Sequence, residues 1–453
     1  MSRLRRRLSV VCRGLTRLPV VLLLAGVVLL VGTPIVTGQL QEQQRSPGVV
    51  GPPARTGPQA GADALRSTIA KAQRRLVDVP KDWSTWAELG SAYVQQGRIT
   101  GDPSYYPKAD GALRRSLELE SATNWKAMVG TAALANARHD FSAARDWGRR
   151  AEALNPHSGN VHGLLVDALT QLGDYDGARI QVQRMLDVEP GVAAFTRASY
   201  DFEQRGQVAA ARDALNRALA QASSPADRAF CRYYLGELAF HNGDPQAALR
   251  EYDAGLTADP TYQQLYAGRG KARAALGQSD DALADYARAV QALPLPELLI
   301  EYGDLLTVSG KADQARQQYD LVAAARQLSA ANGISDHLTA ATYLADHDQA
   351  AEALTEAQAE WSARRTVLTA DALAWALHRN GRDAEALDYS LQATRLGWRN
   401  ATFYYHRGVI RHALGDRDHA REDLSLAMTI NPHFDVVQAP IARRLLDSLG
   451  GGG

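Results

Sequence analysis

The sequence has very little cysteine and no net charge, and each of these features excludes some classes of function. Cys12 and Cys231 are the only cysteines in 453 residues, so there is neither a disulfide framework nor a C-x-x-C motif for zinc or redox chemistry. Fifty basic and fifty acidic residues cancel to a net charge of zero. Because nucleic-acid binding depends on a surplus of clustered Lys and Arg, we expect no nucleic-acid partner.

Catalytic motifs are also lacking. The sequence contains no GxxxxGKS/T phosphate loop, no HExxH or GxSxG motif, and no dinucleotide fingerprint after a strand. Asp and Glu are frequent, but they stand at i, i+4 spacings to Arg, which is typical of a solvated helix surface. Cys231 lies among Phe230, Tyr233 and Tyr234, which favours a packed thiol over a nucleophile. We therefore predict that the protein is not an enzyme and needs no cofactor.

A long apolar run occurs at the N-terminus. Six Arg residues in segment 1–17 precede an uncharged stretch, 18–38, in which thirteen residues are Leu, Val or Ile. About twenty apolar residues cross a bilayer, and flanking positive charge stays in the cytoplasm. This pattern predicts a cytoplasmic segment at 1–17, one transmembrane helix at 18–38, and a single-pass cell-membrane protein with an extracytoplasmic C-terminal domain. The alternative is a cleaved signal sequence, which would make the protein secreted.

Segment 39–62 follows the apolar run and is rich in Gln, Pro and Gly. It has no apolar periodicity, which predicts a flexible linker. Such a linker would hold the folded region away from the membrane.

From about residue 83 to residue 432 the sequence repeats itself, mostly with a spacing of 33 or 34 residues. One marker is a glycine, whose place His139 and Asp348 take in two copies: Gly97, Gly173, Gly206, Gly243, Gly277, Gly310, Gly381 and Gly415. The second marker is an alanine: Ala109, Ala144, Ala178, Ala211, Ala248, Ala282, Ala315, Ala353, Ala386 and Ala420. Gly suits the turn after a first helix because it adopts positive φ. The small Ala lets a second helix approach its neighbour closely. Spacings of 42, 37 and 38 residues predict copies with longer loops.

These copies resemble the tetratricopeptide repeat, a helix–turn–helix unit of 34 residues. The first copy carries a first-helix signature, Trp86-x2-Leu89-Gly90-x2-Tyr93. A later copy carries a second-helix signature, Ala282-x3-Tyr286-x2-Ala289-x4-Pro294. The resemblance implies an all-α fold, a right-handed superhelical solenoid of about ten repeats. The solenoid would occupy 63–432 with an N-terminal capping helix, and 433–453 would form a C-terminal capping helix and a Gly tail.

The resemblance also implies a binding site for a protein or peptide partner. In this family the first helices line a concave groove, and the inward positions here would be Tyr200, Tyr233, Glu237, Lys271, Asp304, Trp375, His378 and Tyr405. Aromatic side chains are common interface anchors, although each could instead pack between helices. The family's basic clamp for acidic peptide tails needs Asn residues that are absent at the corresponding positions, so we do not expect that clamp.

Histidines concentrate in the last two repeats. His378 and His412 hold the same place in neighbouring first helices. Adjacent helices pack about 10 Å apart, which is far for two ligands of one metal ion. We therefore predict no metal site and keep these two residues as weak candidates.

The sequence as a whole predicts a membrane-anchored, extracytoplasmic scaffold that mediates protein–protein interaction in a bacterial cell envelope. An excess of Arg over Lys, 44 to 6, indicates a GC-rich bacterial genome. Two alternatives stay open at this point. One is an extracytoplasmic protein that binds a metal or a small ligand, and the other is a non-catalytic subunit of a transporter or enzyme complex.

Overall fold

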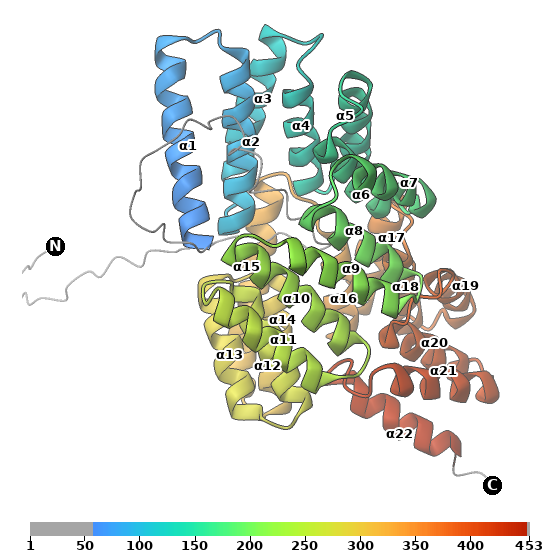
Figure 1. The fold of residues 1–453 in the computed structure, drawn as a ribbon. Coiled ribbons are helices and arrows are strands. Elements are labelled where there is room, and N and C mark those ends of the chain that lie inside the picture. The colour runs from blue at the N-terminus through green and yellow to red at the C-terminus, as the bar shows by residue number, and fades with distance from the viewer. Residues whose placement is uncertain (1–57, 451–453) are drawn as a thin grey trace, which may run out of the picture.

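The computed structural model describes residues 58–450, with side chains from Leu65 onward, and all regular secondary structure in this range is helical. Of its 22 helices, α1 (Pro58–Asp78) and α22 (Gln438–Gly450) stand alone, and the others form consecutive pairs along a solenoid (Figure 1). The first five pairs are α2 (Trp83–Thr100) with α3 (Tyr105–Leu119), α4 (Trp125–Ala137) with α5 (Phe141–Leu154), α6 (Gly159–Leu172) with α7 (Tyr175–Val188), α8 (Val192–Gln204) with α9 (Val208–Gln221), and α10 (Pro225–His241) with α11 (Pro245–Ala258). The next five are α12 (Gln263–Ala275) with α13 (Ser279–Ala292), α14 (Pro296–Val308) with α15 (Ala312–Ala331), α16 (His337–Asp346) with α17 (Ala350–Ala363), α18 (Val367–Arg379) with α19 (Asp383–Ala393), and α20 (Ala401–Ala413) with α21 (Arg417–Ile430).

The turn inside each pair follows the glycine marker of the sequence. Seven of the marker glycines adopt positive φ, from 70° at Gly206 to 81° at Gly173 and Gly415. His139 and Asp348, which take the glycine's place in two copies, also adopt positive φ, at 64° and 60°. The equivalence inferred from spacing is therefore confirmed, because the backbone needs the left-handed conformation at that place whichever residue occupies it.

The alanine marker lies where two helices touch. All ten marker alanines are buried, with at most 3% of their surface exposed. A larger side chain there would push the second helix of a pair away from its neighbour. The all-helical solenoid predicted from the repeats is confirmed.

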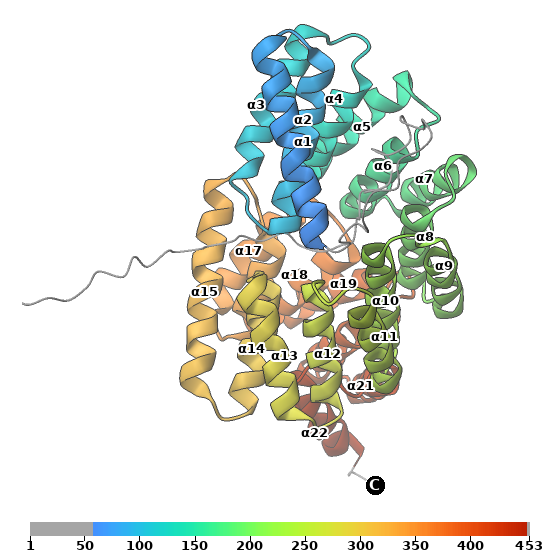
Figure 2. The same cartoon turned by 60° about the vertical axis from the view of Figure 1, so that its left-hand side comes forward.

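The first copy and the longer copies differ from the prediction. Gly97 lies inside α2, and the positive φ falls on Gly101 instead, because α2 continues to Thr100. The extra residues in the copies with longer spacing mainly lengthen helices rather than loops. The clearest case is α15, which runs for 20 residues and stands out as a long rod in Figure 2. No Gly or Pro interrupts this Ala-rich stretch before Gly333, so the helix continues.

The predicted single-pass membrane localisation is not supported and is withdrawn. No helix in residues 58–450 is long and apolar enough to cross a bilayer. Helix α1 has the length, at 21 residues, but it carries charged side chains such as Lys71 and Arg74. The predicted segment 1–17, the transmembrane helix at 18–38 and most of the linker at 39–62 lie outside the described residues. The end of that linker, 58–62, is already part of α1.

The solenoid curls until loops far apart in the sequence meet. The turns at His139, Gly173, Gly206 and Gly243 contact later loops near residues 335, 365, 397 and 431, and we call this contact the seam. The hydrogen bonds across it include ones that join residues separated by 196, 192 and 191 positions. In Figure 1 the green helices α6 to α9 accordingly lie beside the orange and red helices α17 to α20. The nearly constant separation is that of one superhelical turn lying against the next.

Aromatic packing and backbone hydrogen bonds hold the seam together. The Val367 backbone N–H donates to the Tyr175 hydroxyl at 2.9 Å, and the Asn431 side chain donates to the Phe240 carbonyl at 2.9 Å. Tyr175 belongs to a buried cluster with Val367, Trp398 and Phe403. These contacts fix the curvature of the solenoid.

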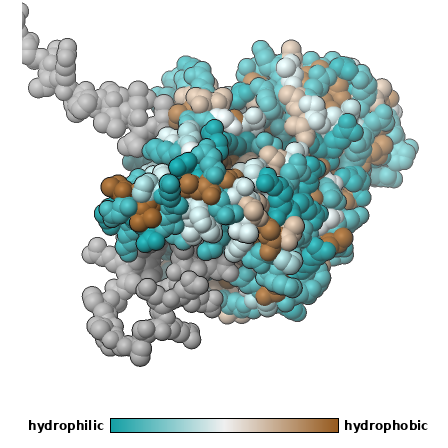
Figure 3. Space-filling view, turned by 90° about the horizontal axis from the view of Figure 1, so that it is seen from above, coloured by the Kyte–Doolittle hydropathy of each residue, from teal (hydrophilic) through white to brown (hydrophobic). Residues whose placement is uncertain are grey.

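The outer surface offers no large apolar area on the face seen in Figure 3, where brown residues are scattered among hydrophilic ones. Exposed large apolar side chains are spread over several helices, for example Ile180 on α7 and Val308 on α14. Isolated apolar residues of this kind are normal for a protein surface. The residues that the repeat pattern places on the first helices are the remaining candidates for a site.

Candidate functional site

Seven of the eight residues predicted to line the groove fall into two groups, and the eighth lies at the seam. Tyr233, Glu237 and Lys271 come together from α10 and α12, with Asp304 on α14 next to them in the array. Trp375, His378 and Tyr405 come together from α18 and α20. Tyr200, on α8, is the residue at the seam. All eight stand on first helices, as the repeat pattern predicts.

Glu237 and Lys271 form an ion pair between neighbouring first helices. Lys271 Nζ lies 2.8 Å from Glu237 Oε2, and the Tyr252 hydroxyl donates to Glu237 Oε1 at 2.5 Å. His241 Nε2 lies 3.7 Å from the same carboxylate. Burial would raise the pKa of Glu237, but the positive charges of Lys271 and His241 outweigh it and hold the pKa below its ordinary value. This carboxylate is ionised at neutral pH and already has its partners.

Asp304 lies in a similar environment on α14. It accepts a hydrogen bond from the Tyr319 hydroxyl at 2.7 Å, and His347 Nε2 lies 3.2 Å away. Burial would lower the pKa of His347, but the hydrogen bonds to Asp304 and to the Tyr343 carbonyl raise it above its ordinary value. The pair gives a second place where a carboxylate and a cation meet on the inner face.

Trp375 is the centre of the second group. Its ring stacks on His406 at 4.1 Å between centroids and on His378 at 5.0 Å, and its Nε1 donates to Asp346 Oδ1 at 2.8 Å. Trp375 is 4% exposed and Tyr405 is 3% exposed. Both aromatic side chains therefore pack between helices and offer little area to a partner.

His406 is the buried polar residue in that group. Its Nδ1 lies 2.9 Å from Asp371 Oδ2, and only 1% of the residue is exposed. Burial would lower the pKa of His406, but Asp371 and Asp346 raise it above its ordinary value. His378, by contrast, lies at the edge of the group, with its Nδ1 2.5 Å from Asp383 Oδ1.

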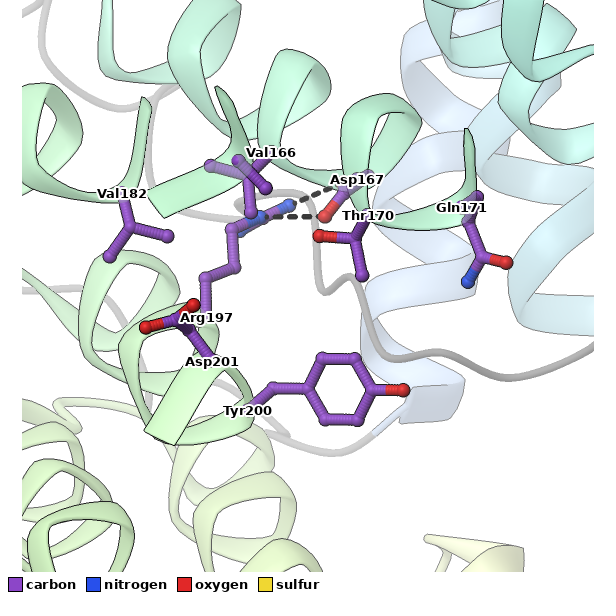
Figure 4. Close-up of a pocket in the computed structure, with 9 residues that line it drawn as sticks. Val166, Asp167, Thr170, Gln171, Val182, Arg197, Tyr200 and Asp201 are labelled. Carbon is purple, nitrogen blue, oxygen red and sulfur yellow. Dashed lines mark hydrogen bonds and ion pairs between the residues drawn. The ribbon is translucent and has the colours of Figure 1, made fainter. Parts of the chain in front are cut away.

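Tyr200 lines a small pocket between α6 and α8, shown in Figure 4. On one side of this pocket Arg197 donates hydrogen bonds to both oxygens of Asp167, at 2.9 and 2.8 Å. The ring of Tyr200 meets Trp398 edge-to-face at 5.9 Å across the seam. Burial raises the pKa of the Tyr200 hydroxyl well above its ordinary value. The residue thus contributes to the closure of the solenoid.

Tyr233 belongs to a cluster of tyrosine rings. Its centroid lies 5.2 Å from Tyr234, 6.3 Å from Tyr252 and 6.0 Å from Tyr262. Cys231 is fully buried nearby, and burial raises the pKa of its thiol to about 12. A neutral, inaccessible thiol is a poor nucleophile, in agreement with the packed thiol that the sequence predicts.

Sequence reasoning missed a series of inward carboxylates. These are Glu297 and Glu301 on α14, Asp336 before α16, Asp346 at the end of α16, and Asp435 before α22. One signal was available: Asp346 stands two residues before the turn residue Asp348, as His241 stands before Gly243. The others have irregular positions in the repeat, so the periodic pattern could not single them out.

No metal centre emerges from the described residues. Within residues 58–450 no group of three or more His, Cys, Asp and Glu side chains could hold a metal ion. His378 and His412 therefore belong to no such group in the part of the chain that the structure describes. The metal-binding alternative has no support from the geometry.

Comparison with known proteins recognises the repeats in two regions. A tetratricopeptide repeat family profile matches residues 196–262, and a second matches residues 401–434. No curated protein matches the chain.

Solved structures of similar fold have low sequence identity and low TM-scores. A tetratricopeptide repeat protein from Parabacteroides merdae is 19% identical with a TM-score of 0.34, covering 57% of this chain and 99% of that one. The Cut9–Hcn1 hetero-tetramer of the APC/C is 14% identical with a TM-score of 0.39, covering 86% and 83%. A human IFIT1 dimer with PPP-AAAA is 12% identical with a TM-score of 0.43, covering 82% and 86%. The chain contains tetratricopeptide repeats, recognised at 196–262 and 401–434, within a solenoid of helix pairs.

Proposed function

We propose that the protein is a non-catalytic scaffold that binds a protein or peptide partner on the inner face of its solenoid. Tetratricopeptide repeats are typical of proteins that bind other proteins, and that supports the class of function. The observation that supports this site is the set of charged side chains on the first helices, above all Glu237, Lys271 and Asp304. Their side chains keep 14%, 20% and 17% of their surface exposed.

Half-buried charges of this kind suit recognition. They are positioned by fixed partners such as Tyr252 and Tyr319, so little side-chain entropy is lost when a partner binds. Charge complementarity contributes specificity and association rate more than raw affinity. The buried aromatic residues Trp375 and Tyr405 would act by holding the first helices in place, and His378, whose side chain is 19% exposed, would lie at the rim of the surface.

The proposal is tested with a crosslinking pull-down that compares two single variants. Lys271→Glu reverses the charge on the inner face, whereas Arg217→Glu makes the same reversal on the outer helix α9, where the Arg217 side chain is 64% exposed. Circular dichroism and thermal unfolding establish first that both variants fold.

A partner that wild type and Arg217→Glu retain, and that Lys271→Glu loses, supports the proposal. Equal retention of every partner by all three proteins, or equal loss by both variants, contradicts an inner-face site.

A further inference from the structure

Six carboxylates gather on α14, on α16 and in the segments just before α16 and α22. We call Glu297, Glu301, Asp304, Asp336, Asp346 and Asp435 together the acidic wall. Each of these carboxylates lies within electrostatic reach of another member. Burial raises the pKa of Glu297, Glu301, Asp435 and Asp346, and the negative charge of another member adds to each shift: Asp336 and Glu301 act on Glu297, Asp304 acts on Glu301 and Asp435, and Asp435 acts on Asp346.

The members of the acidic wall come from different repeats. Asp304 belongs to α14 and Asp435 to the loop before α22, yet the charge of one acts on the other. Gln438, at the start of α22, donates to Asp346 Oδ1 on α16 at 2.7 Å. The wall is therefore a feature of the curled solenoid, built from several repeats.

The cations that act on this wall are Lys271, His347, His406, Arg326 and Arg364. Lys271 is engaged with Glu237 at 2.8 Å, and it also lowers the pKa of Glu301 from a greater distance. His347 lies 3.2 Å from Asp304. Neutral donors satisfy part of the remainder: the Tyr286 hydroxyl donates to Glu301 at 2.8 Å. At one end of the wall, burial raises the pKa of Asp336 against the opposing charges of Arg364 and Arg326, and no described cation opposes the raised pKa of Glu297.

That end consists of Glu297 and Asp336. Both carboxylate oxygens of Glu297 and the Oδ2 atom of Asp336 are buried, and none of them has a hydrogen-bond partner among the described residues. Burial raises the pKa of Glu297 to about 8, with a smaller contribution from the negative charge of Asp336. A buried polar group without a partner destabilises a fold by about 1–3 kcal/mol. Such a group calls for an explanation, and a ligand that supplies the missing partner is one.

We propose that the acidic wall binds an extended segment of the partner that is rich in Lys and Arg, with Glu297 and Asp336 receiving one of its cationic side chains. This inference rests on the proposed scaffold function and specifies the chemistry of its partner. The charges are spread along the wall instead of converging on one point, which suits a row of separate cations. In the described range no group of three such ligands could hold a metal ion.

The negative charge of the wall excludes partners that are themselves negatively charged. A phosphate backbone is repelled by carboxylates, and an acidic peptide tail is repelled in the same way. Cations also relieve the mutual repulsion of the carboxylates, so their binding favours the ionised form of each group.

The test is a binding titration of the full chain with a labelled deca-arginine peptide, followed by fluorescence anisotropy. The double variant Glu297→Gln/Asp346→Asn neutralises the wall with side chains of nearly the same shape. The matched control Asp313→Asn/Glu352→Gln neutralises two exposed carboxylates on the outer helices α15 and α17. We expect the wall variant to bind about ten-fold more weakly, which corresponds to about 1.4 kcal/mol, and the control to change less than two-fold.

Equal weakening in both variants, or binding of deca-glutamate as tight as that of deca-arginine, would overturn the proposal. Circular dichroism checks that both variants fold, and Asp435→Asn replaces Asp346→Asn if the double variant does not. If wild type captures a partner on its inner face but does not bind deca-arginine, the inference fails while the scaffold function stands. If no partner depends on the inner face, both fail.

Proton release gives a second readout. At pH 7.5 Glu297, with a pKa of about 8, is largely protonated, so a cation bound beside it displaces its proton. Calorimetric titration of wild type with deca-arginine in two buffers of different ionisation enthalpy should show this release. Glu297→Gln should reduce it, and an unchanged proton count in that variant contradicts the assignment of Glu297.

Discussion

The seam makes a specific prediction about two glycines that the sequence cannot distinguish. Gly173 and Gly277 are both turn glycines with positive φ, at 81° and 76°. A Cβ on Gly173 would lie 2.3 Å from the Arg365 carbonyl oxygen, whereas a Cβ on Gly277 would have nothing within 4 Å. Alanine at either place costs the same left-handed backbone penalty, roughly 1–2 kcal/mol. Only Gly173→Ala has to push the seam apart as well.

The additional cost follows from the geometry of the seam. Ordinary contact begins near 3.4 Å, so the loops must separate by about 1 Å from the 2.3 Å approach. That movement breaks the hydrogen bond from the Val367 N–H to the Tyr175 hydroxyl. Loss of a partner for a buried group costs about 1–3 kcal/mol. We therefore expect Gly173→Ala to destabilise the protein by about 1–3 kcal/mol more than Gly277→Ala.

Hydrogen exchange is the appropriate assay because a long repeat array need not unfold in one step. The amide of Val367 should exchange faster in Gly173→Ala and at the wild-type rate in Gly277→Ala. Tyr175→Phe provides a coupling test, since it should accelerate Val367 exchange in the Gly277→Ala background and have little further effect in the Gly173→Ala background. Equal behaviour of the two alanine variants would refute the account of the seam.

Three further predictions concern single sites. The thiol of Cys231, buried and with a pKa of about 12, should resist iodoacetamide at pH 8 in a Cys12→Ser background and react once urea unfolds the chain; rapid labelling of the native protein would contradict its burial. The raised pKa of Glu297 means that the native state holds its proton between about pH 4.5 and 8 while the unfolded state has lost it, so stability falls as pH rises through this window. Glu297→Gln should remove that fall, and urea unfolding at pH 5 and pH 8 measures it; parallel pH profiles for the variant and wild type would show that Glu297 does not titrate this way. Asp348→Gly should stabilise the protein by roughly 1 kcal/mol because it relieves a positive φ, whereas His139→Gly should not, because His139 Nδ1 lies 2.9 Å from the Ser335 carbonyl across the seam; thermal unfolding distinguishes them, and equal gains would argue against the His139 contact.

The local fold was predictable because the residues that form each helix pair and its turn lie within one repeat. The spacing alone identified His139 and Asp348 as turn residues, and their φ angles confirm it. The marker alanines were likewise identified before their burial was known, and all of them are buried. Gly97 was misplaced because α2 continues for one more turn to Gly101, and helix ends depend on capping and packing more than on a periodic marker.

The candidate site was only partly predictable. Spacing placed Glu237 and Lys271 on neighbouring first helices, and the structure brings them to 2.8 Å. Trp375 and Tyr405 were placed on the same face, but their burial depends on how closely α18 and α20 pack. Glu297 and Asp435 carry no repeated signal, so the sequence offered no reason to select them.

The sequence by itself determined the helices, the turns and the pairing of neighbours, since these depend on residues within one or two repeats. Only the tertiary structure decided the seam and the acidic wall. Both depend on curvature, which is the sum of small rotations between successive pairs, and a small change in each rotation would part Tyr175 from Val367 and Asp304 from Asp435. A pattern with a period near 34 residues carries no information about contacts between residues 191 to 196 positions apart.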